Sequence, residues 1–373
     1  ALATYAPDGY DVGMEATHHG PTAVGTPSMF VEVGSCPEQW ADPDAAEAVA
    51  RAVLDLRGVA PYGPPVDGVD GSDDDGSDDD RSGDVGSGDD AMGGQAGSTM
   101  APESDPHRNL VGFGGGHYAP RFERLVRETD WCVGHVAPDW GLEAMGDPTT
   151  ERARTVLAAA FERSRARYAL LDGDRPAVDA AVRDLGYEVV SETWVRTTAG
   201  VPLALVDRLE ATVAPVDAGL RFGDLAVGWE RDAAFTVVAC SDDLLPAAND
   251  VDAGAVRDAV AESALAFGTA DNGTRVVGPV VVPAPTAAGP GDPADPVIEA
   301  LVGVLRAGYD DVRRDGDVVE ARRDRFDPAR AADLGVPEGP AFGRLAGGEA
   351  VEVDGREVEP EAVHTEDVRR LEL

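Results

Sequence analysis

Apolar and polar residues follow two different periods along this chain, and their order predicts the elements. Short apolar runs at Tyr10–Ala16 and Met29–Gly34 are typical of strands. A helix is expected after Asp42-Pro43, because DPDAAEAVARAVLDLRG carries alanine, valine and leucine at helical spacing and glycine at its end. The first 57 residues therefore predict strand, loop, strand and helix.

The same alternation resumes in the middle of the chain. RNLVGFGGGHY predicts a strand that runs into a glycine loop, and a helix follows over Arg121–Thr129. The next expected elements are the strand WCVGHVA, a long helix after Asp147-Pro148 to about Arg167, the strand YALLDGD, the helix PAVDAAVRDLG and the strand YEVVSETW. This order predicts an α/β fold, a sheet layered with helices on both faces.

Two regions differ from this core in texture. Residues 58–106 include GSDDDGSDDDRSGDVGSGDD, which has too few apolar residues to form a core and predicts an acidic disordered insertion. From residue 214 onward, proline-glycine breaks separate short strands (FTVVAC, RVVGPVVVP), helices at 254–267 and 294–308, and a valine-rich tail. We expect residues 1–57 and 107–213 to form the main domain and 214–373 an appended smaller α+β domain of unknown function.

The charge of the chain is extreme. Seventy acidic residues stand against 31 basic ones, all of them arginine, for a formal net charge of −39. An acidic interaction protein would have few apolar residues, whereas 43% of this chain is hydrophobic. We favour adaptation to a salty cytoplasm, since screening within about 3 Å at 1 M salt suppresses self-repulsion. The charge therefore describes the solvent and not a binding partner.

The cysteines and the hydropathy indicate the cellular compartment of the protein. Cys36, Cys132 and Cys240 lack metal-type spacing and predict no disulfide framework, which fits a reducing cytoplasm. No membrane-spanning run and no signal peptide are found, so we expect a cytoplasmic protein that does not contact membranes, and a monomer. Because YDVGMEATHHG already reads as a strand entering a loop, we expect an N-terminal part of the fold to be missing.

Histidines occur in three sequence segments that are candidates for a functional site. His18 and His19 stand in MEATHHGPT, His117 in FGGGHYAP and His135 in CVGHVAP, each at or near the carboxyl end of a predicted strand. Ligands of α/β sheets bind at such ends, so these imidazoles are expected to meet as metal ligands or as acid and base. Backbone-bonded loop histidines are the alternative. Glu15 is a candidate general base, a partner that orients a histidine, or an edge-strand carboxylate.

The glycine loop in GFGGGHYAP is the most informative motif of the chain. Gly114, Gly115 and Gly116 allow backbone N–H groups to approach a phosphate or an ester oxyanion, although a tight turn would also use glycine. Tyr118 is expected to pack rather than to stack on a base. Arg121 starts a basic stripe on the next predicted helix that contacts phosphates or balances carboxylates. No GxSxG elbow is present.

Four motifs in the same order strongly resemble the archaeal- and plant-type D-aminoacyl-tRNA deacylases: MEATHHGPT, PSMFVEVGS with Trp40 after it, GFGGGHYAPRF and VGHVAPDW. The resemblance covers residues 1 to about 195. It implies a nucleoside-phosphorylase or peptidyl-tRNA-hydrolase type of α/β fold, zinc dependence, and hydrolysis of the ester between a D-amino acid and the 3′ end of tRNA. It marks the site residues, which are His18, His19, Gly114, Gly115, Gly116, His117, Tyr118, Arg121 and His135.

We therefore predict an ester hydrolase acting on D-aminoacyl-tRNA. His117 and Glu15 are the expected catalytic residues, the three glycines with Tyr118 and Arg121 the substrate-binding residues, and His18, His19 and His135 the zinc ligands. Two alternatives remain, a non-catalytic tRNA-binding remnant and a phosphorylase-like nucleoside enzyme. In the tail, residues 334–363 look similar to a stretch of the ribonuclease Z family, but the HxHxDH motif of those nucleases is absent, so no nuclease activity is inferred.

Overall fold

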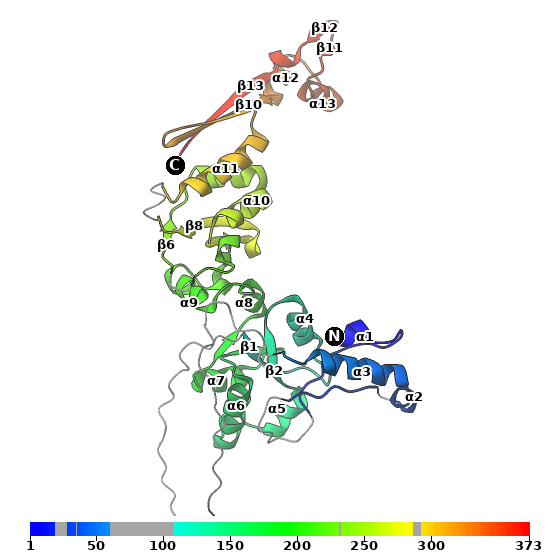
Figure 1. The fold of residues 1–373 in the computed structure, drawn as a ribbon. Helices are drawn as coiled ribbons and strands as arrows, with labels where there is room; N and C mark the ends of the chain where they lie inside the picture. The colour runs from blue at the N-terminus through cyan, green and yellow to red at the C-terminus, as the bar shows by residue number, and fades with distance from the viewer. Residues whose placement is uncertain (19–27, 35, 60–107, 231–232, 286–291) are drawn as a thin grey trace, which may run out of the picture. The chain divides into compact units, whose positions relative to one another are not determined.

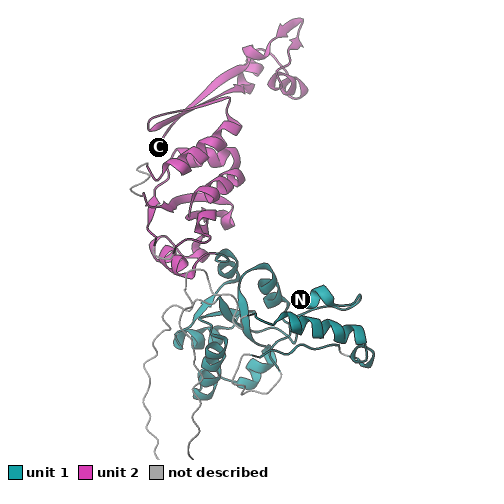
Figure 2. Cartoon of the chain, in the orientation of Figure 1, with its two compact units in different colours: residues 1–200 teal, residues 201–373 magenta. Residues whose placement is uncertain are grey.

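The computed structural model describes residues 1–18, 28–34, 36–59, 108–230, 233–285 and 292–373 (Figure 1). Nearly all of the predicted acidic insertion, and His19, lie outside the described residues. The chain folds as two compact units, residues 1–200 and 201–373 (Figure 2). The sequence placed a division after residue 213, whereas the helix that ends at Thr212 belongs to the second unit.

The first unit contains one parallel sheet and the helices around it. Its elements are α1 (Leu2–Tyr5), α2 (Pro37–Trp40), α3 (Pro43–Asp55), β1 (Asn109–Phe113), α4 (Pro120–Glu128), β2 (Cys132–Ala137), α5 (Asp139–Met145), α6 (Glu151–Ser164), β3 (Tyr168–Leu171), α7 (Pro176–Asp184), β4 (Glu188–Val190) and α8 (Glu192–Thr197). The strand order is β2-β1-β3-β4, and every neighbouring pair is parallel. The predicted α/β class is confirmed, and β1 lies between two partners with all five residues buried.

Alternation along β1 shows what covers each face of the sheet. Val111 and Phe113 pack in one cluster with residues of α6 and α7. Gly112 points the other way, where a Cβ atom would lie 2.6 Å from the ring of Phe122 on α4. Helices therefore pack on both faces, and glycine at 112 lets α4 approach the strand closely.

The two N-terminal strands predicted from the sequence are wrong. Residues 10–14 form no strand, and Glu15 makes only an isolated bridge with Tyr118. Residues 29–34 are also irregular. An apolar run becomes a strand only where another strand pairs with it, and the described residues offer neither segment such a partner.

The start of helix α3 is where the local sequence predicts it. The Asp42 carboxylate accepts hydrogen bonds from the amides of Asp44 and Ala45, so the helix begins where the Asp-Pro signal predicts. A capping serine also corrects one prediction: Ser191 accepts from the amide of Trp194 and starts α8, so the strand YEVVSETW ends at Val190.

The second unit is built on an antiparallel sheet with two long helices. Its elements are α9 (Leu203–Thr212), β5 (Leu220–Phe222), β6 (Phe235–Val238), α10 (Leu244–Ser263), β7 (Ala266–Ala270), β8 (Arg275–Pro283), α11 (Asp295–Gly308), β9 (Asp311–Asp315), β10 (Val318–Phe326), α12 (Pro328–Asp333), α13 (Pro340–Ala346), β11 (Val351–Val353), β12 (Arg356–Val358) and β13 (His364–Glu372). Short 3₁₀ turns (η1–η4) occupy Val216–Ala218, Asp224–Ala226, Asp271–Gly273 and Pro360–Ala362. The first sheet has the order β5-β7-β8-β6.

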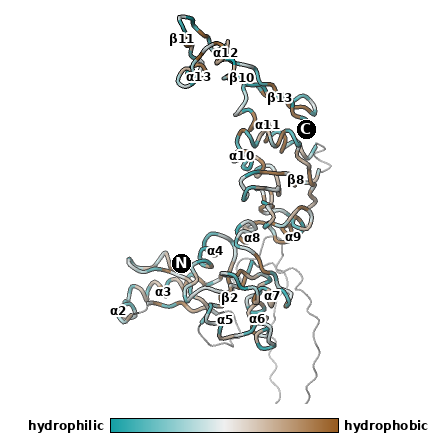
Figure 3. Tube along the Cα trace, turned by 180° about the vertical axis from the view of Figure 1, so that it is seen from behind, coloured by the Kyte–Doolittle hydropathy of each residue, from teal (hydrophilic) through white to brown (hydrophobic). Residues whose placement is uncertain are grey.

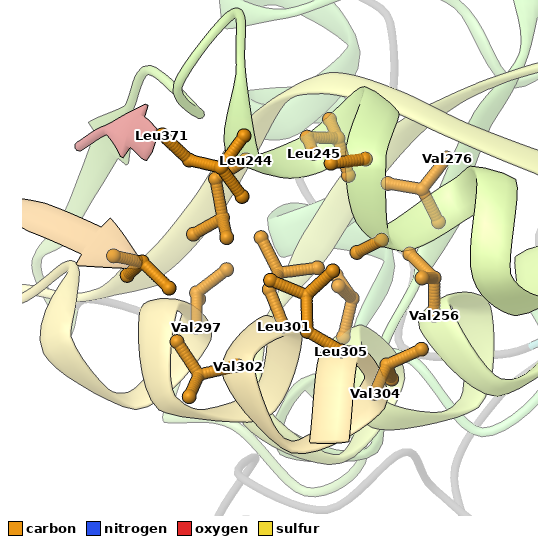
Figure 4. Close-up of a cluster of buried hydrophobic side chains, with 14 of the residues drawn as sticks. Leu244, Leu245, Val256, Val276, Val297, Leu301, Val302, Val304, Leu305 and Leu371 are labelled. Atoms are coloured by element: carbon orange, nitrogen blue, oxygen red, sulfur yellow. The ribbon is translucent and has the colours of Figure 1, made fainter. Parts of the chain in front are cut away.

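The core of this unit lies between α10, α11 and the sheet (Figure 4). Leu244, Val256, Leu301 and Leu305 are fully buried there. The helix predicted at 254–267 is wrong at its end, because the chain leaves the helix at Ser263 and residues 266–270 pair as β7. Helix α11, in contrast, matches the predicted 294–308 closely.

The C-terminal residues form a second, three-stranded sheet of order β13-β10-β9 and a hairpin of β11 and β12. The hairpin has its own small core with Val336, Leu345, Val351 and Val358. Hydrophilic and hydrophobic residues alternate along the trace of both units (Figure 3). Among the described helices, none combines the length and the apolar character that a membrane span needs.

Candidate functional site

The glycine loop leaves the carboxyl end of β1 and is held by two hydrogen bonds to the end of β2 and the start of α5. The amide of Gly114 donates to Ala137 O at 2.8 Å, and the amide of Asp139 donates to Gly115 O at 2.9 Å. Gly114 has a φ of +108°, and a Cβ atom there would lie 2.4 Å from Asp172 O and 2.5 Å from Arg175 Nε. Glycine is thus required at 114 by both conformation and space.

The N-terminal segment docks against this loop although it is not a strand. Ala119 N donates to Met14 O at 2.8 Å, and Ala16 N donates to His117 O at 2.8 Å. Thr17 N then donates to Val136 O at 2.9 Å. These bonds join residues more than 100 positions apart and bring MEATH alongside both the glycine loop and β2.

Three side chains meet as a result, and we call them the Glu15–His18–His117 cluster. His117 Nε2 lies 3.3 Å from Glu15 Oε1, and His18 Nε2 lies 3.8 Å from Glu15 Oε2. The two imidazole centroids are 4.5 Å apart. The Glu15 carboxylate therefore lies within reach of both imidazoles, half-exposed to the solvent.

This cluster has the donor set and the spacing of a metal site. One ligand atom from each residue lies within 4.8 Å of the others. Tetrahedral zinc with ligands at about 2.0–2.2 Å would need them roughly 3.3–3.6 Å apart, which the measured distances approach. His18 Nδ1 lies 2.7 Å from Ala16 O, which can only accept, so Nδ1 carries the proton and Nε2 is the nitrogen left for a metal. The residues fit a zinc ion.

His135 does not join this cluster among the described residues. It lies in β2 in register with Val111, whose side chain packs toward α6 and α7. Paired residues of parallel strands share a face, so His135 points to that side of the sheet. Burial lowers the pKa of His135, which keeps its imidazole neutral. The three histidine segments thus converge only in part.

Tyr118 and Arg121, both expected to bind substrate, lie in different surroundings. Tyr118 is 60% exposed, so it is not packed in the core, although its ring lies edge-on to His117 with centroids 5.0 Å apart. Arg121 donates to Glu192 Oε2 at 2.8 Å, to Asp172 Oδ1 at 3.1 Å and to Leu171 O at 2.9 Å. Its guanidinium is therefore engaged with carboxylates, the second of the two roles considered for the arginine stripe.

Sequence reasoning did not single out the charged residues that support the loop. Arg175 donates from Nε to Asp172 O at 2.8 Å and bonds to the Asp139 carboxylate. Asp172 follows β3 and Asp139 follows β2, so Arg175 ties two strand ends together across Gly114. The signal was present, because polar residues directly after buried parallel strands collect at one sheet edge.

Two of the cysteines are unsuited to nucleophilic chemistry. Burial raises the pKa of the Cys240 thiol to about 11 and also raises the pKa of the Cys132 thiol. Both thiols are therefore neutral near pH 7, whereas the reactive form of cysteine is the thiolate.

A glycine loop at the carboxyl end of a parallel sheet, beside a glutamate and two histidines, defines an α/β protein with a hydrolase-like or metal-dependent site. Residues 1–66 and 89–190 match the family model for D-aminoacyl-tRNA deacylase. The D-aminoacyl-tRNA deacylase of Haloarcula marismortui is 46% identical over 375 residues, covering all of this chain and 73% of that protein. The protein of the same name from Halorubrum lacusprofundi is 48% identical over 379 residues, covering all of this chain and 69% of that protein.

The chain belongs to the D-aminoacyl-tRNA deacylase family. A solved structure described as a conserved protein of unknown function is 27% identical, with a TM-score of 0.32 over 49% of this chain and 50% of that one.

Proposed function

We propose that this protein hydrolyses the ester bond between a D-amino acid and the 3′ end of tRNA. The observation that carries the proposal is the Glu15–His18–His117 cluster beside the glycine loop, in a chain of the deacylase family. Ester hydrolysis needs a group that removes a proton from water and donors that hold the developing oxyanion. The cluster and the loop amides are of these two kinds.

Each residue of the proposed site has a role in the hydrolysis. If the cluster holds no ion, His117 is the base: it takes a proton from water, and the water oxygen bonds to the ester carbonyl carbon. Glu15, 3.3 Å from His117 Nε2, orients the imidazole and stabilises its protonated form. Backbone amides of Gly115 and Gly116 hold the negative carbonyl oxygen. The bond to the ribose oxygen then breaks, that oxygen takes the proton, and a free D-amino acid and tRNA leave.

Zinc is the proposed cofactor, with Glu15, His18 and His117 as the residues that would hold it. A bound zinc ion would lower the pKa of a water molecule to about 7 and polarise the ester carbonyl. In that case His117 serves as a ligand rather than as the base. The predicted ligand His19 lies outside the described residues, and the predicted ligand His135 does not join the cluster.

The proposal also includes the type of fold, the cellular location and the oligomeric state. We propose a fold of the nucleoside-phosphorylase or peptidyl-tRNA-hydrolase type for the parallel-sheet unit, with the C-terminal residues as an extension of it. We also propose a cytoplasmic monomer that acts on tRNA. The relatives in halophilic archaea support the expectation of a salt-adapted enzyme.

The test is deacylation of D-tyrosyl-tRNA and L-tyrosyl-tRNA in molar KCl, with and without a zinc chelator. We expect selective release from the D-substrate, loss of activity with chelator, and a loss of about 10²–10⁴-fold in His117→Ala. His135→Ala is the matched control, because this histidine lies outside the cluster, and it should retain most activity. Equal losses in both variants at unchanged melting temperature would show that the cluster is wrongly assigned.

Two outcomes identify the alternatives. Binding of tRNA without any release would indicate a non-catalytic tRNA-binding protein. Turnover of nucleosides that requires inorganic phosphate would indicate a phosphorylase-like enzyme.

A further inference from the structure

Two large aromatic side chains are exposed on the segments that follow β1 and β2. Tyr118 is 60% exposed, and its ring lies edge-on to His117 with centroids 5.0 Å apart. Trp140 is 50% exposed in the first turn of α5, which starts directly after β2. Exposed aromatic surface next to a polar site is typical of a place where a planar ligand binds.

The first turn of α5 is fixed to the loop by the residue before Trp140. Asp139 N donates to Gly115 O at 2.9 Å, and the Asp139 carboxylate bonds to Arg175, which in turn donates to Asp172 O at 2.8 Å. Trp140 therefore belongs to a segment held at two points against the strand ends. An aromatic ring on a rigid support loses little conformational entropy when a ligand stacks on it.

Two arginines close to the glycine loop are already engaged by carboxylates. Arg121 is paired with Asp172 and Glu192, and Arg175 is paired with Asp139. The chain as a whole carries a net charge of −39. Electrostatic attraction to phosphates also fades in concentrated salt, whereas stacking on an aromatic ring needs no charge.

We propose that Trp140 and Tyr118 form a stacking site for the unpaired 3′-terminal base of the tRNA. The site would place the aminoacyl ester of that terminal nucleotide over the glycine loop and the Glu15–His18–His117 cluster. This inference rests on the proposed function for its substrate, and it adds the recognition of the terminal base and the role of Trp140.

The kinetic test compares Trp140→Ala, Trp140→Phe and Tyr118→Ala in molar KCl with D-tyrosyl-tRNA. Stacking contributes about 1–3 kcal/mol per base, so each alanine variant should raise KM about tenfold and leave kcat within about threefold. Phenylalanine at 140 should restore most of the affinity, which a purely structural role for tryptophan would not predict. Trp40→Ala is the matched control, because Trp40 is 64% exposed on α2 and its indole bonds to Gly34 O.

A binding test that needs no turnover separates this inference from the proposed function. The trinucleotide CCA, the unpaired end of tRNA, is titrated against tryptophan fluorescence of the full chain, beside the same trinucleotide with an abasic last ribose. We expect quenching by CCA that weakens about tenfold without the last base, and a smaller quench in Trp140→Phe. Such binding without deacylation would support the stacking site and remove the proposed function. Equal affinity with and without the base, or an unchanged KM in Trp140→Ala, would overturn the stacking site.

Discussion

At the scale of single residues, the site depends on where side chains are absent as much as on where they are present. Gly114 lies against the Arg175 side chain and the Asp172 carbonyl with no room for a Cβ atom. Gly116, two residues on, has open space around it. The first of the three consecutive glycines therefore allows close packing, whereas the last is exposed and has room for a side chain.

Alanine at 114 should distort the loop. A φ of +108° is unfavourable for any side chain, and the new Cβ atom would clash with backbone that cannot move easily. We expect Gly114→Ala to lower the free energy of unfolding by about 2 kcal/mol or more and to reduce kcat. Gly116→Ala, the control, should keep the wild-type melting temperature. Thermal unfolding of both variants checks this, and equal melting temperatures would show that the loop tolerates the change.

At the scale of elements, helix starts obey local chemistry while strands require partners. Helix α3 begins at the residue that its Asp-Pro cap specifies, and α6 begins after Thr150, whose hydroxyl accepts from the amide of Ala153. Among the described residues, the N-terminal apolar runs have no capping residue or strand partner of this kind, and they stay irregular.

Elements of the second unit also meet at one histidine, and this contact makes their packing sensitive to pH.

His364 at the start of β13 joins three elements. Its Nδ1 lies 2.9 Å from Asp324 Oδ2 on β10, and its Nε2 lies 3.1 Å from Leu345 O on α13. Both partners only accept, so both ring nitrogens donate when the imidazole is protonated. The hydrogen bond to Asp324 raises the pKa of His364 above its ordinary value; burial opposes this, while Leu345 O and the charges of Asp324 and Glu361 add to it.

A raised folded-state pKa means that protonated His364 stabilises the fold below its unfolded pKa of about 6.5. That contribution, on the order of 1 kcal/mol, should disappear as the pH rises through the folded pKa. We expect the melting temperature to fall between pH 6 and pH 9 more steeply in the wild type than in His364→Gln. Parallel profiles for the two proteins would contradict the role of His364.

At the scale of the whole molecule, the charge of −39 sets the conditions for folding. Many arginines pair with carboxylates, but acidic residues outnumber basic ones 70 to 31, so most carboxylates cannot have an arginine of their own. The Debye length falls from about 10 Å at 0.1 M to about 3 Å at 1 M. The two compact units share this excess of acid, so both should respond to salt.

We therefore expect the melting temperature to rise steadily as KCl increases from 0.1 M to several molar. Affinity for tRNA should survive molar salt, because salt relieves repulsion between two polyanions and preserves the fold, in contrast to the usual weakening. Thermal unfolding and tRNA binding are measured over the same KCl series. Affinity that falls steadily across the range in which the protein stays folded would contradict this expectation.

The sequence by itself determined the order of strands and helices in residues 109–190 except for the short helix α5, which it did not predict. Apolar period, caps and glycine stops act within a few residues, and for that reason they can be read from the sequence. It also determined the salt-adapted charge, and it placed Glu15, His18 and His117 among the candidates. Only the tertiary structure decided which candidates meet. Backbone bonds between residues 14–17 and the distant glycine loop and β2 brought His18 and Glu15 to His117, whereas the face of β2 turned His135 away. The carboxylates of Asp172, directly after β3, and of Glu192 in α8 engage Arg121, and this pairing too depends on how separate elements pack.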